Sequence, residues 1–259
     1  ITVMTTGFIP CGAKMPIIGL FAGAIFGNSP LVAVSALFIG IAAVLISGVI
    51  LKKFKTFSGK PAPFVMELPP YRIPTAKNTL RHMWSKCAQY LKKMGGLILI
   101  ASIVVWLLSY YPRPTESVDG TTKHSYEMSY MGHIGKVCQP IFEPMDFEWQ
   151  ASIAMISGIP AKEIVVSTMN VLYAHPDDTE IADGEELTLH AQERIAKSMS
   201  TPSAVAFLIF SLLYLPCIAT IMAIASELNW KWAVGSALYN TAVAWLLAWV
   251  AYLVTSLLV

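Results

Sequence analysis

The sequence contains an unbroken apolar run from Leu31 to Leu51, with no charged side chain among its 21 residues. A helix of about 20 residues is about 30 Å long, which matches the thickness of the hydrocarbon core of a bilayer. A stretch this long and this apolar has no place on the surface of a soluble domain. The run therefore predicts a membrane-spanning helix.

Five further stretches have the composition of membrane spans, although several are short or interrupted. Only 13% of the 259 residues are charged, which is about half the share in soluble domains. The stretches are Ile1–Gly27, Gly95–Tyr111, Trp149–Tyr173, Ser203–Ser226 and Trp232–Val259. We therefore predict an all-α fold, a polytopic transmembrane helical bundle.

Charge sets the expected orientation of this bundle. Residues 52–93 contain ten lysines and arginines and one acid, Glu67, which predicts a cytoplasmic location by the positive-inside rule. Within them, Ala76–Met94 reads as a basic amphipathic helix in the cytoplasmic interface, or alternatively as a helix packed on a cytoplasmic domain. Alternation then places residues 112–148 outside the cell and residues 174–200, with seven acids, inside.

Three of the expected spans are interrupted by proline. The interruptions are "GFIPCGAKMP" (7–16), "SGIPAKEIVVS" (157–167) and "YLPCIAT" (214–220). A proline inside a helix frees backbone carbonyls, and in lipid these carbonyls need other partners. Because broken helices at membrane depth surround the binding sites of many transporters, the interruptions predict a transport pathway.

The first two interruptions share a pattern. Ala13-Lys14 aligns with Ala161-Lys162, with a small residue or proline before each pair and aliphatic residues after it. On the expected topology, the first copy crosses from inside to outside and the second crosses in the opposite direction. We therefore predict that the broken helices belong to two inverted repeats.

Lys14, Lys162 and Glu163 are the only charged residues in these two interrupted spans. A charge at the centre of a span costs about 2.5–3.5 kcal/mol on insertion scales, so such residues are functional candidates. One alternative is that the lysines reach toward an interface and Glu163 pairs with one of them. Another is a Lys14–Glu163 ion pair that holds the two broken helices in register.

Two cysteines, Cys11 and Cys217, directly follow the prolines of the first and third interruptions. Thiolates beside freed carbonyls suit a borderline transition metal such as Fe²⁺, Mn²⁺ or Co²⁺, although a free cysteine can also be a small buried apolar group. With Glu163 they form the candidate set of metal ligands. The other candidate gate and pathway residues are Pro10, Gly12, Lys14, Met15, Pro160, Lys162, Met169 and Pro216, of which the methionines alternatively fill the core.

Motifs of soluble enzymes do not occur in the sequence. It has no GxxxxGK[ST], GxSxG or HExxH pattern, so we expect no catalytic residues and no enzymatic turnover by this chain. No nucleic-acid partner is expected.

Four sequences, in order along the chain, resemble a known family: "PCGAKMP", "GIPAKEIVVSTMNVLY", "LLYLPCIATIMAIASEL" and "WKWAVGSALYNTAVAWLLAWVAYLV". Over essentially the whole chain they resemble the membrane domain of FeoB-type bacterial ferrous iron transporters. The resemblance implies gate repeats, shared with nucleoside-transporter-like proteins, and gate cysteines that meet Fe²⁺ at Cys11 and Cys217. Serines that flank the first gate cysteine in many relatives are absent here, so they have no role in this chain.

The resemblance also implies a larger protein in the bacterial cytoplasmic (inner) membrane. In the family, a cytoplasmic G domain that binds GTP with Mg²⁺ precedes the membrane domain, so this chain is expected to be the C-terminal part. The implied partners are transported Fe²⁺, the lipid bilayer, that G domain, small cytoplasmic accessory proteins and further copies of the protein. The expected segments are 1–51 (first gate motif and span), 52–94 (basic arm and interfacial helix), 95–111 (span), 112–148 (extracytoplasmic loop), 149–173 (second gate motif), 174–200 (acidic cytoplasmic loop, read as a solvated linker) and 201–259 (C-terminal spans).

The leading hypothesis is therefore the permease part of a ferrous iron transporter. One alternative is a nucleoside-transporter-like permease for a small organic solute, which predicts a polar pocket with side chains such as Asn170 and Asn240. A second alternative is a membrane anchor without transport, which leaves the broken spans and buried charges unexplained.

Overall fold

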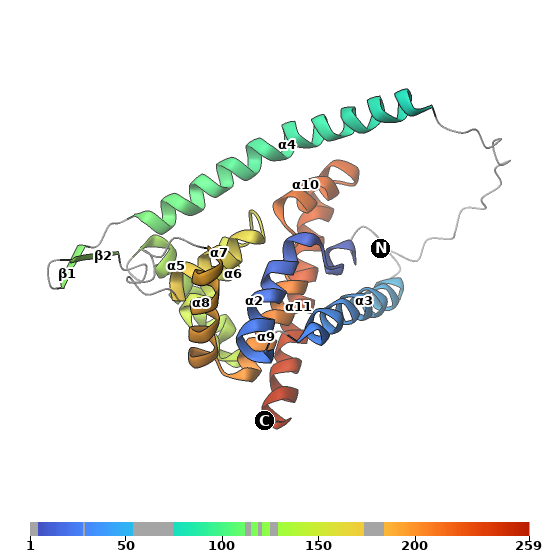
Figure 1. The fold of residues 1–259 in the computed structure, drawn as a ribbon. Helices are drawn as coiled ribbons and strands as arrows, with labels where there is room; N and C mark the ends of the chain where they lie inside the picture. The colour runs from blue at the N-terminus through green and yellow to red at the C-terminus, as the bar shows by residue number, and fades with distance from the viewer. Residues whose placement is uncertain are drawn as a thin grey trace.

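The computed structural model describes residues 5–27, 29–53, 75–111, 115–118, 121–124, 129–173 and 184–258. These residues are almost entirely helical, which confirms the all-α class, and the strands among them form one short antiparallel hairpin (Figure 1). The elements are η1 (Thr6–Phe8), η2 (Gly12–Lys14), α2 (Met15–Phe26), α3 (Pro30–Lys52), α4 (Ala76–Tyr110), β1 (Thr115–Val118), β2 (Thr121–His124), α5 (Tyr130–Phe142), η4 (Glu143–Met145), α6 (Trp149–Ser157), α7 (Glu163–Tyr173), α8 (Gly184–Ser198), α9 (Thr201–Leu213), α10 (Ile218–Glu227) and α11 (Trp230–Leu258).

Three helical stretches among the described residues are long and apolar enough to cross a membrane. They are α3, the α9–α10 stretch taken across its break, and α11. The first part of the chain and the end of α4 form shorter apolar helices, Gly12–Phe26 and Leu99–Tyr110. The expected span Trp149–Tyr173 is divided into α6 and α7. The chain is thus a multi-pass helical membrane bundle, in which four of the six expected spans are shortened or interrupted.

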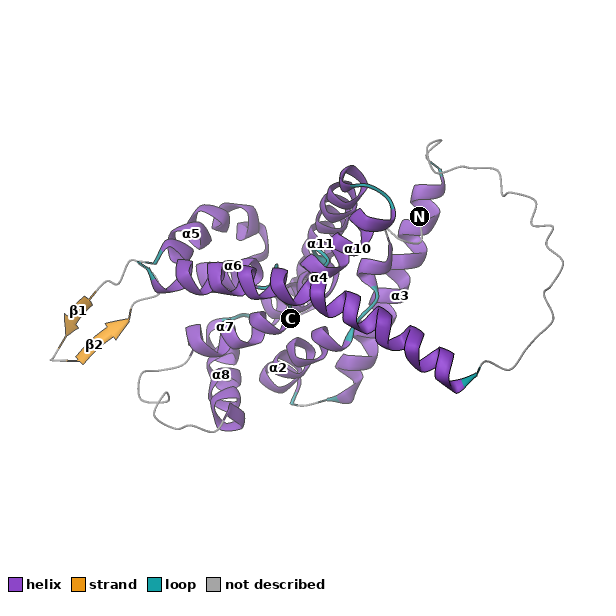
Figure 2. Ribbon diagram, turned by 90° about the horizontal axis from the view of Figure 1, so that it is seen from above, coloured by secondary structure: helices purple, strands orange, loops and turns teal. Residues whose placement is uncertain are grey.

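Helix α4 contains two elements that the sequence analysis predicts as separate. The expected amphipathic helix and the span that follows it form one continuous helix of 35 residues. Its N-terminal half projects beyond the other helices (Figures 1 and 2), and Leu80, Met83, Trp84 and Leu91 on it are exposed. The position of this half in a membrane interface stays a prediction. The proline-rich arm at residues 67–74 lies outside the described residues.

The core is built around α9. Eight consecutive residues of this helix, Ala206–Leu213, are buried, and α9 packs along α11. The Phe207 ring stacks on Phe21 of α2 at 4.8 Å, which ties α2 to the same core. Seen from above, α5, α6, α7 and α8 lie on one side of the bundle, and α3, α10 and α11 lie on the other (Figure 2).

The segment expected outside the cell contains more than a loop. Helix α5 packs against α6, and its Gly135 allows a close approach, because a Cβ there would lie 2.6 Å from Ile153 Cγ1. The hairpin of β1 and β2 pairs Thr115 with His124 and Val118 with Thr121.

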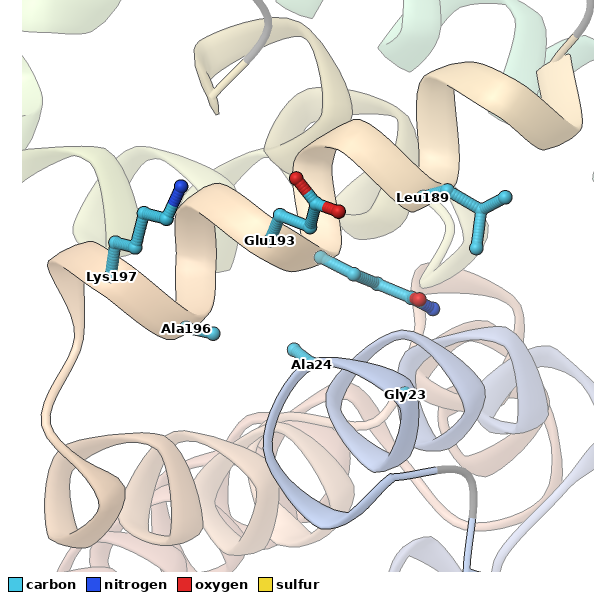
Figure 3. Close-up of a pocket in the computed structure, with 7 residues that line it drawn as sticks. Gly23, Ala24, Leu189, Glu193, Ala196 and Lys197 are labelled. Carbon is cyan, nitrogen blue, oxygen red and sulfur yellow. The ribbon is translucent and has the colours of Figure 1, made fainter.

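The reading of residues 174–200 as a solvated linker is wrong for its second half. Residues 184–198 form α8, which packs on both α2 and α7. Ala191 and Ile195 are fully buried and Met199 is 7% exposed, so apolar residues four apart form the inner face of this acidic helix. Figure 3 shows the groove on the outer side of this contact, where Glu193 and Lys197 lie above Ala24.

Candidate functional site

Three breaks in the helices line one cavity. The first lies between η1 and η2, the second joins α6 to α7, and the third joins α9 to α10. The cavity has a volume of about 390 Å³. Its lining residues are Gly7, Ile9, Pro10, Cys11, Ala13, Lys14, Pro160, Ala161, Lys162, Glu163, Pro216, Cys217, Ala219 and Thr220. Segments from both ends of the chain and from its middle thus form one site.

The second break follows from glycine and proline. Helix α6 ends at Ser157, and the Ile159 amide bonds to the Ile156 carbonyl at 3.1 Å in a tighter turn. Pro160 has no amide hydrogen and cannot continue the helix. The Met155 carbonyl loses the partner it would have in a regular helix, because that partner, the Ile159 amide, bonds to the Ile156 carbonyl instead.

The third break frees a carbonyl in the same way. Helix α9 ends at Leu213, and Tyr214 is extended with ψ of −175°. The chain then passes through Pro216 and restarts as α10, with Cys217 as its N-cap residue. The Ser211 carbonyl is among the last of α9, which a regular helix leaves without an internal partner.

Residues at the second and third breaks donate hydrogen bonds to each other's free backbone carbonyls. Lys162 Nζ donates to the Ser211 carbonyl at 3.1 Å, and the Tyr214 hydroxyl donates to the Met155 carbonyl at 3.1 Å. The Ile218 amide, the first of α10, donates to the Ile159 carbonyl at 3.4 Å. A cation at a helix C-terminus also interacts favourably with the helix dipole. The two breaks therefore form one interlocked unit that meets the need of lipid-embedded backbone for partners.

The first break is closed by its own lysine. Lys14 is 3% exposed, and its ammonium group donates to the carbonyls of Gly7 at 3.0 Å and Ile9 at 3.2 Å. Lys162 is equally buried. The interpretation that these lysines reach toward an interface is therefore wrong, because each ammonium group binds carbonyls released by a break.

The Lys14–Glu163 ion pair is not formed among the residues that the structure describes. Lys14 is engaged with its own segment, and Glu163 is the exposed first residue of α7. A carboxylate in the first turn of a helix is stabilised by the helix dipole. Glu163 thus contributes an accessible negative charge to the lining of the cavity.

Both candidate cysteines line the cavity. Cys11 is exposed at the start of η2, and Cys217 is partly buried, with its Sγ 3.3 Å from Thr220 Oγ1. Among the described residues, no three His, Cys, Asp or Glu side chains are grouped closely enough to hold a metal ion. The two thiols and Glu163 therefore share a cavity without forming a closed coordination shell.

Two family models match the chain. The Gate model, described as "Nucleoside recognition", matches residues 91–231, and the model "Ferrous iron transport protein B C terminus" matches residues 33–86. The chain is 38% identical, over 97% of its length, to the "Fe(2+) transport protein A/Fe(2+) transporter FeoB fusion protein" of Porphyromonas gingivalis. It belongs to the FeoB family. The "Fe(2+) transporter FeoB" of Methanocaldococcus jannaschii is 34% identical over the whole chain, and that of Campylobacter jejuni is 36% identical over 88% of it.

The chain spans about a third of the length of these FeoB relatives: 34% of the first and 37% of each of the other two. No solved structure matches the chain. The Gate match covers the second and third breaks, whereas the first break precedes both matched ranges. The structure brings this first break into the same cavity as the other two.

The remaining gate and pathway candidates of this FeoB chain divide into two groups. Pro10, Pro160 and Pro216 line the cavity. Gly12, Met15 and Met169 are not among the lining residues. Met15 is 51% exposed at the start of α2, and Met169 is fully buried in the core of the bundle, as the alternative interpretation of the methionines expects.

Sequence reasoning missed two residues that hold the FeoB cavity in shape. The Tyr214 hydroxyl donates a hydrogen bond to the Met155 carbonyl of α6. The sequence offered one signal for this role, a hydroxyl in an apolar stretch two residues before a proline. Gly158 gives this hydroxyl room, because a Cβ there would lie 2.5 Å from the Tyr214 oxygen and 2.3 Å from Val165 Cγ2.

Proposed function

We propose that this chain is the permease part of a ferrous iron transporter in the cytoplasmic membrane. The observation that supports this proposal most is the shared cavity, which Cys11, Cys217 and Glu163 line from three helix breaks. Thiolate and carboxylate ligands together suit a borderline cation such as Fe²⁺. An open ligand set also suits cargo, because a transported ion has to leave its site.

In this proposal, ferrous iron enters from outside, passes the two thiols and Glu163, and leaves to the cytoplasm. Lys14 and Lys162 face the cavity, but their ammonium groups bind backbone carbonyls. They therefore hold the broken segments in place as a scaffold, and the thiols and the carboxylate contact the ion. A G domain in the complete protein, which binds GTP with Mg²⁺, would supply the signal that opens the gates. Small cytoplasmic accessory proteins and self-association would act on that complete protein.

Uptake of radioactive ferrous iron by cells that express the full-length protein tests this proposal. We expect the double variant Cys11→Ser, Cys217→Ser to lose most uptake, because serine hydroxyls bind Fe²⁺ more weakly than thiolates do. The matched control is Cys87→Ser, Cys138→Ser, since these cysteines lie on α4 and α5 and do not line the cavity. Wild-type uptake by the first variant, at an equal level in the membrane, would remove the thiols from the pathway.

A nucleoside permease is the second candidate, because the matching Gate model is described as "Nucleoside recognition". The cavity is large enough for a small organic molecule. Its lining among the described residues, however, has no aromatic, asparagine or glutamine side chain, and Asn170 lies instead on α7, bonded to Thr188 at 3.3 Å. Competition of nucleosides with iron uptake would favour this candidate, and transport unaffected by nucleosides would exclude it.

A further inference from the structure

Asn240 is a buried amide for which the fold provides no hydrogen bond. It lies on α11 and is fully buried. Within the described residues, neither its Oδ1 nor its Nδ2 has a hydrogen-bond partner. Since nearly all buried polar side-chain atoms in proteins are hydrogen-bonded, an asparagine with both polar atoms unpaired requires a separate explanation. An apolar residue of the same shape would be the more stable choice here.

The position of this amide connects it to the cavity. A Cβ built on Gly7 would lie 2.7 Å from Asn240 Nδ2 and 3.5 Å from Pro216 Cγ. Gly7 and Pro216 both belong to the lining of the cavity. Asn240 Nδ2 therefore lies directly behind Gly7, a wall residue of the first break that Pro216 of the third break also approaches. Only glycine at position 7 lets the amide come this close.

A second unpaired group of α11 faces the same segment. The hydroxyl of Tyr239 is buried without a partner among the described residues, and the Tyr239 ring packs edge-on against Phe8 at 6.4 Å between ring centres. Two neighbouring residues of α11 that contact η1 thus carry polar atoms without a partner among the described residues. This arrangement resembles the wall of a polar path more than the filling of an apolar core.

We propose that the Asn240 carboxamide, turned so that Oδ1 takes the place of Nδ2 on the side of Gly7, binds the transported divalent cation, directly or through a water ligand, and that the path of the ion continues between Gly7 and Pro216 toward α11. This inference rests on the proposed permease function and adds a ligand from a helix without a break. A carboxamide oxygen is a neutral, hard ligand. Together with two thiols it favours borderline divalent ions over soft ions, and it adds no charge that would retain the ion.

Two substitutions in the full-length protein test this proposal. Asn240→Leu keeps the shape and removes both polar atoms, and Asn240→Asp keeps an oxygen and adds a charge. We expect Asn240→Leu to reduce iron uptake at least tenfold while the thermal unfolding midpoint stays equal or rises. We expect Asn240→Asp to bind Mn²⁺ at least tenfold more tightly, measured by electron paramagnetic resonance on the purified protein. The control is Ser152→Ala, which removes an unpaired buried hydroxyl of α6 away from the cavity and should leave uptake unchanged.

The outcomes separate this proposal from the permease function. If the wild type takes up iron and Asn240→Leu does so equally well, the role of Asn240 is overturned and the permease function stands. If Asn240→Leu fails to accumulate in the membrane, Asn240→Asp decides, and an unchanged Mn²⁺ affinity overturns the proposal. If the wild type takes up no iron at all, both proposals fail.

Discussion

The ammonium group of Lys162 lies 4.3 Å from the centre of the Tyr214 ring, so the second and third helix breaks hold each other in place. Each of these side chains also caps a carbonyl on the other side of the contact, Lys162 at Ser211 and Tyr214 at Met155. A desolvated contact of an ammonium group with an aromatic face is worth about 2 kcal/mol or more. The second and third breaks are therefore linked by contacts in both directions and do not act as two independent kinks.

Removal of the hydrogen bond from Tyr214 to the Met155 carbonyl should lower the stability of the bundle. Tyr214→Phe keeps the ring beside Lys162 but leaves the buried Met155 carbonyl without its donor. We expect a loss of about 1–3 kcal/mol in the free energy of unfolding, measured by denaturation of the purified full-length protein in detergent. Tyr130→Phe is the control, because Tyr130 is 54% exposed. Equal stability of the two variants would show that the bond to Met155 contributes nothing.

The contributions of Lys162 and Tyr214 to the free energy of unfolding should also depend on each other. Lys162→Met leaves the Ser211 carbonyl uncapped and removes the cation from the Tyr214 ring. In a double-mutant cycle with Tyr214→Leu, which removes the ring and its hydroxyl, we expect an interaction energy of about 0.5–3 kcal/mol, as for other residues in direct contact. Strict additivity, within about 0.5 kcal/mol, would mean that the breaks act separately. Lys197→Met, at an exposed position on α8, provides the control for loss of a lysine.

Gly40 of α3 determines where the first break lies. A Cβ on Gly40 would come within 2.9 Å of Pro10 Cδ and 3.0 Å of the Phe8 carbonyl oxygen. Gly40→Ala should therefore displace the segment that holds Cys11, lower stability by about 1–3 kcal/mol and reduce iron uptake. Gly48→Ala is a matched control on the same helix, since a Cβ there meets no atom within 4 Å. Normal uptake by Gly40→Ala would show that the site does not depend on this close packing.

The length and the breaks of the membrane helices could be predicted from the sequence, and their mutual contacts could not. Uncharged runs identify α3 and α11, and proline identifies the ends of α6 and α9, because both signals are local. The partners of Lys14 and Lys162 are backbone carbonyls, which have no sequence signature, and the ion pair with Glu163 that the sequence offered as one alternative is not formed among the described residues. Asn240 stands out only when its neighbours in space are known.

Helix α8 shows a different limit of sequence reasoning. Its seven-acid segment suggested a linker, yet Ala191 and Ile195 are buried, because spacing by four residues forms an apolar face even in a charged helix. Arg194 also donates to the Tyr173 carbonyl at the end of α7, at 3.1 Å.

The packing of α8 leads to a prediction about stability. Ile195→Ala should cost about 2–5 kcal/mol in the free energy of unfolding, as for other buried isoleucines, because the side chain is fully buried in the core on a helix that packs on α2 and α7. Leu189→Ala, at a 56% exposed position on the same helix, should be nearly neutral (Figure 3). Unfolding midpoints of the two purified variants compare them directly, and indistinguishable midpoints would restore the interpretation of this segment as a linker.

X-ray absorption at the iron edge tests the central claim, that iron meets the thiols of Cys11 and Cys217, most directly. The sample is the purified full-length protein loaded with Fe²⁺ without oxygen, with the Cys87→Ser, Cys138→Ser variant as control. The account predicts an iron–sulfur distance near that of a metal–thiolate bond, about 2.3 Å by analogy with zinc, in the wild type and the control. It predicts that this signal disappears in the Cys11→Ser, Cys217→Ser variant. A shell of oxygen and nitrogen alone in the wild type would contradict it.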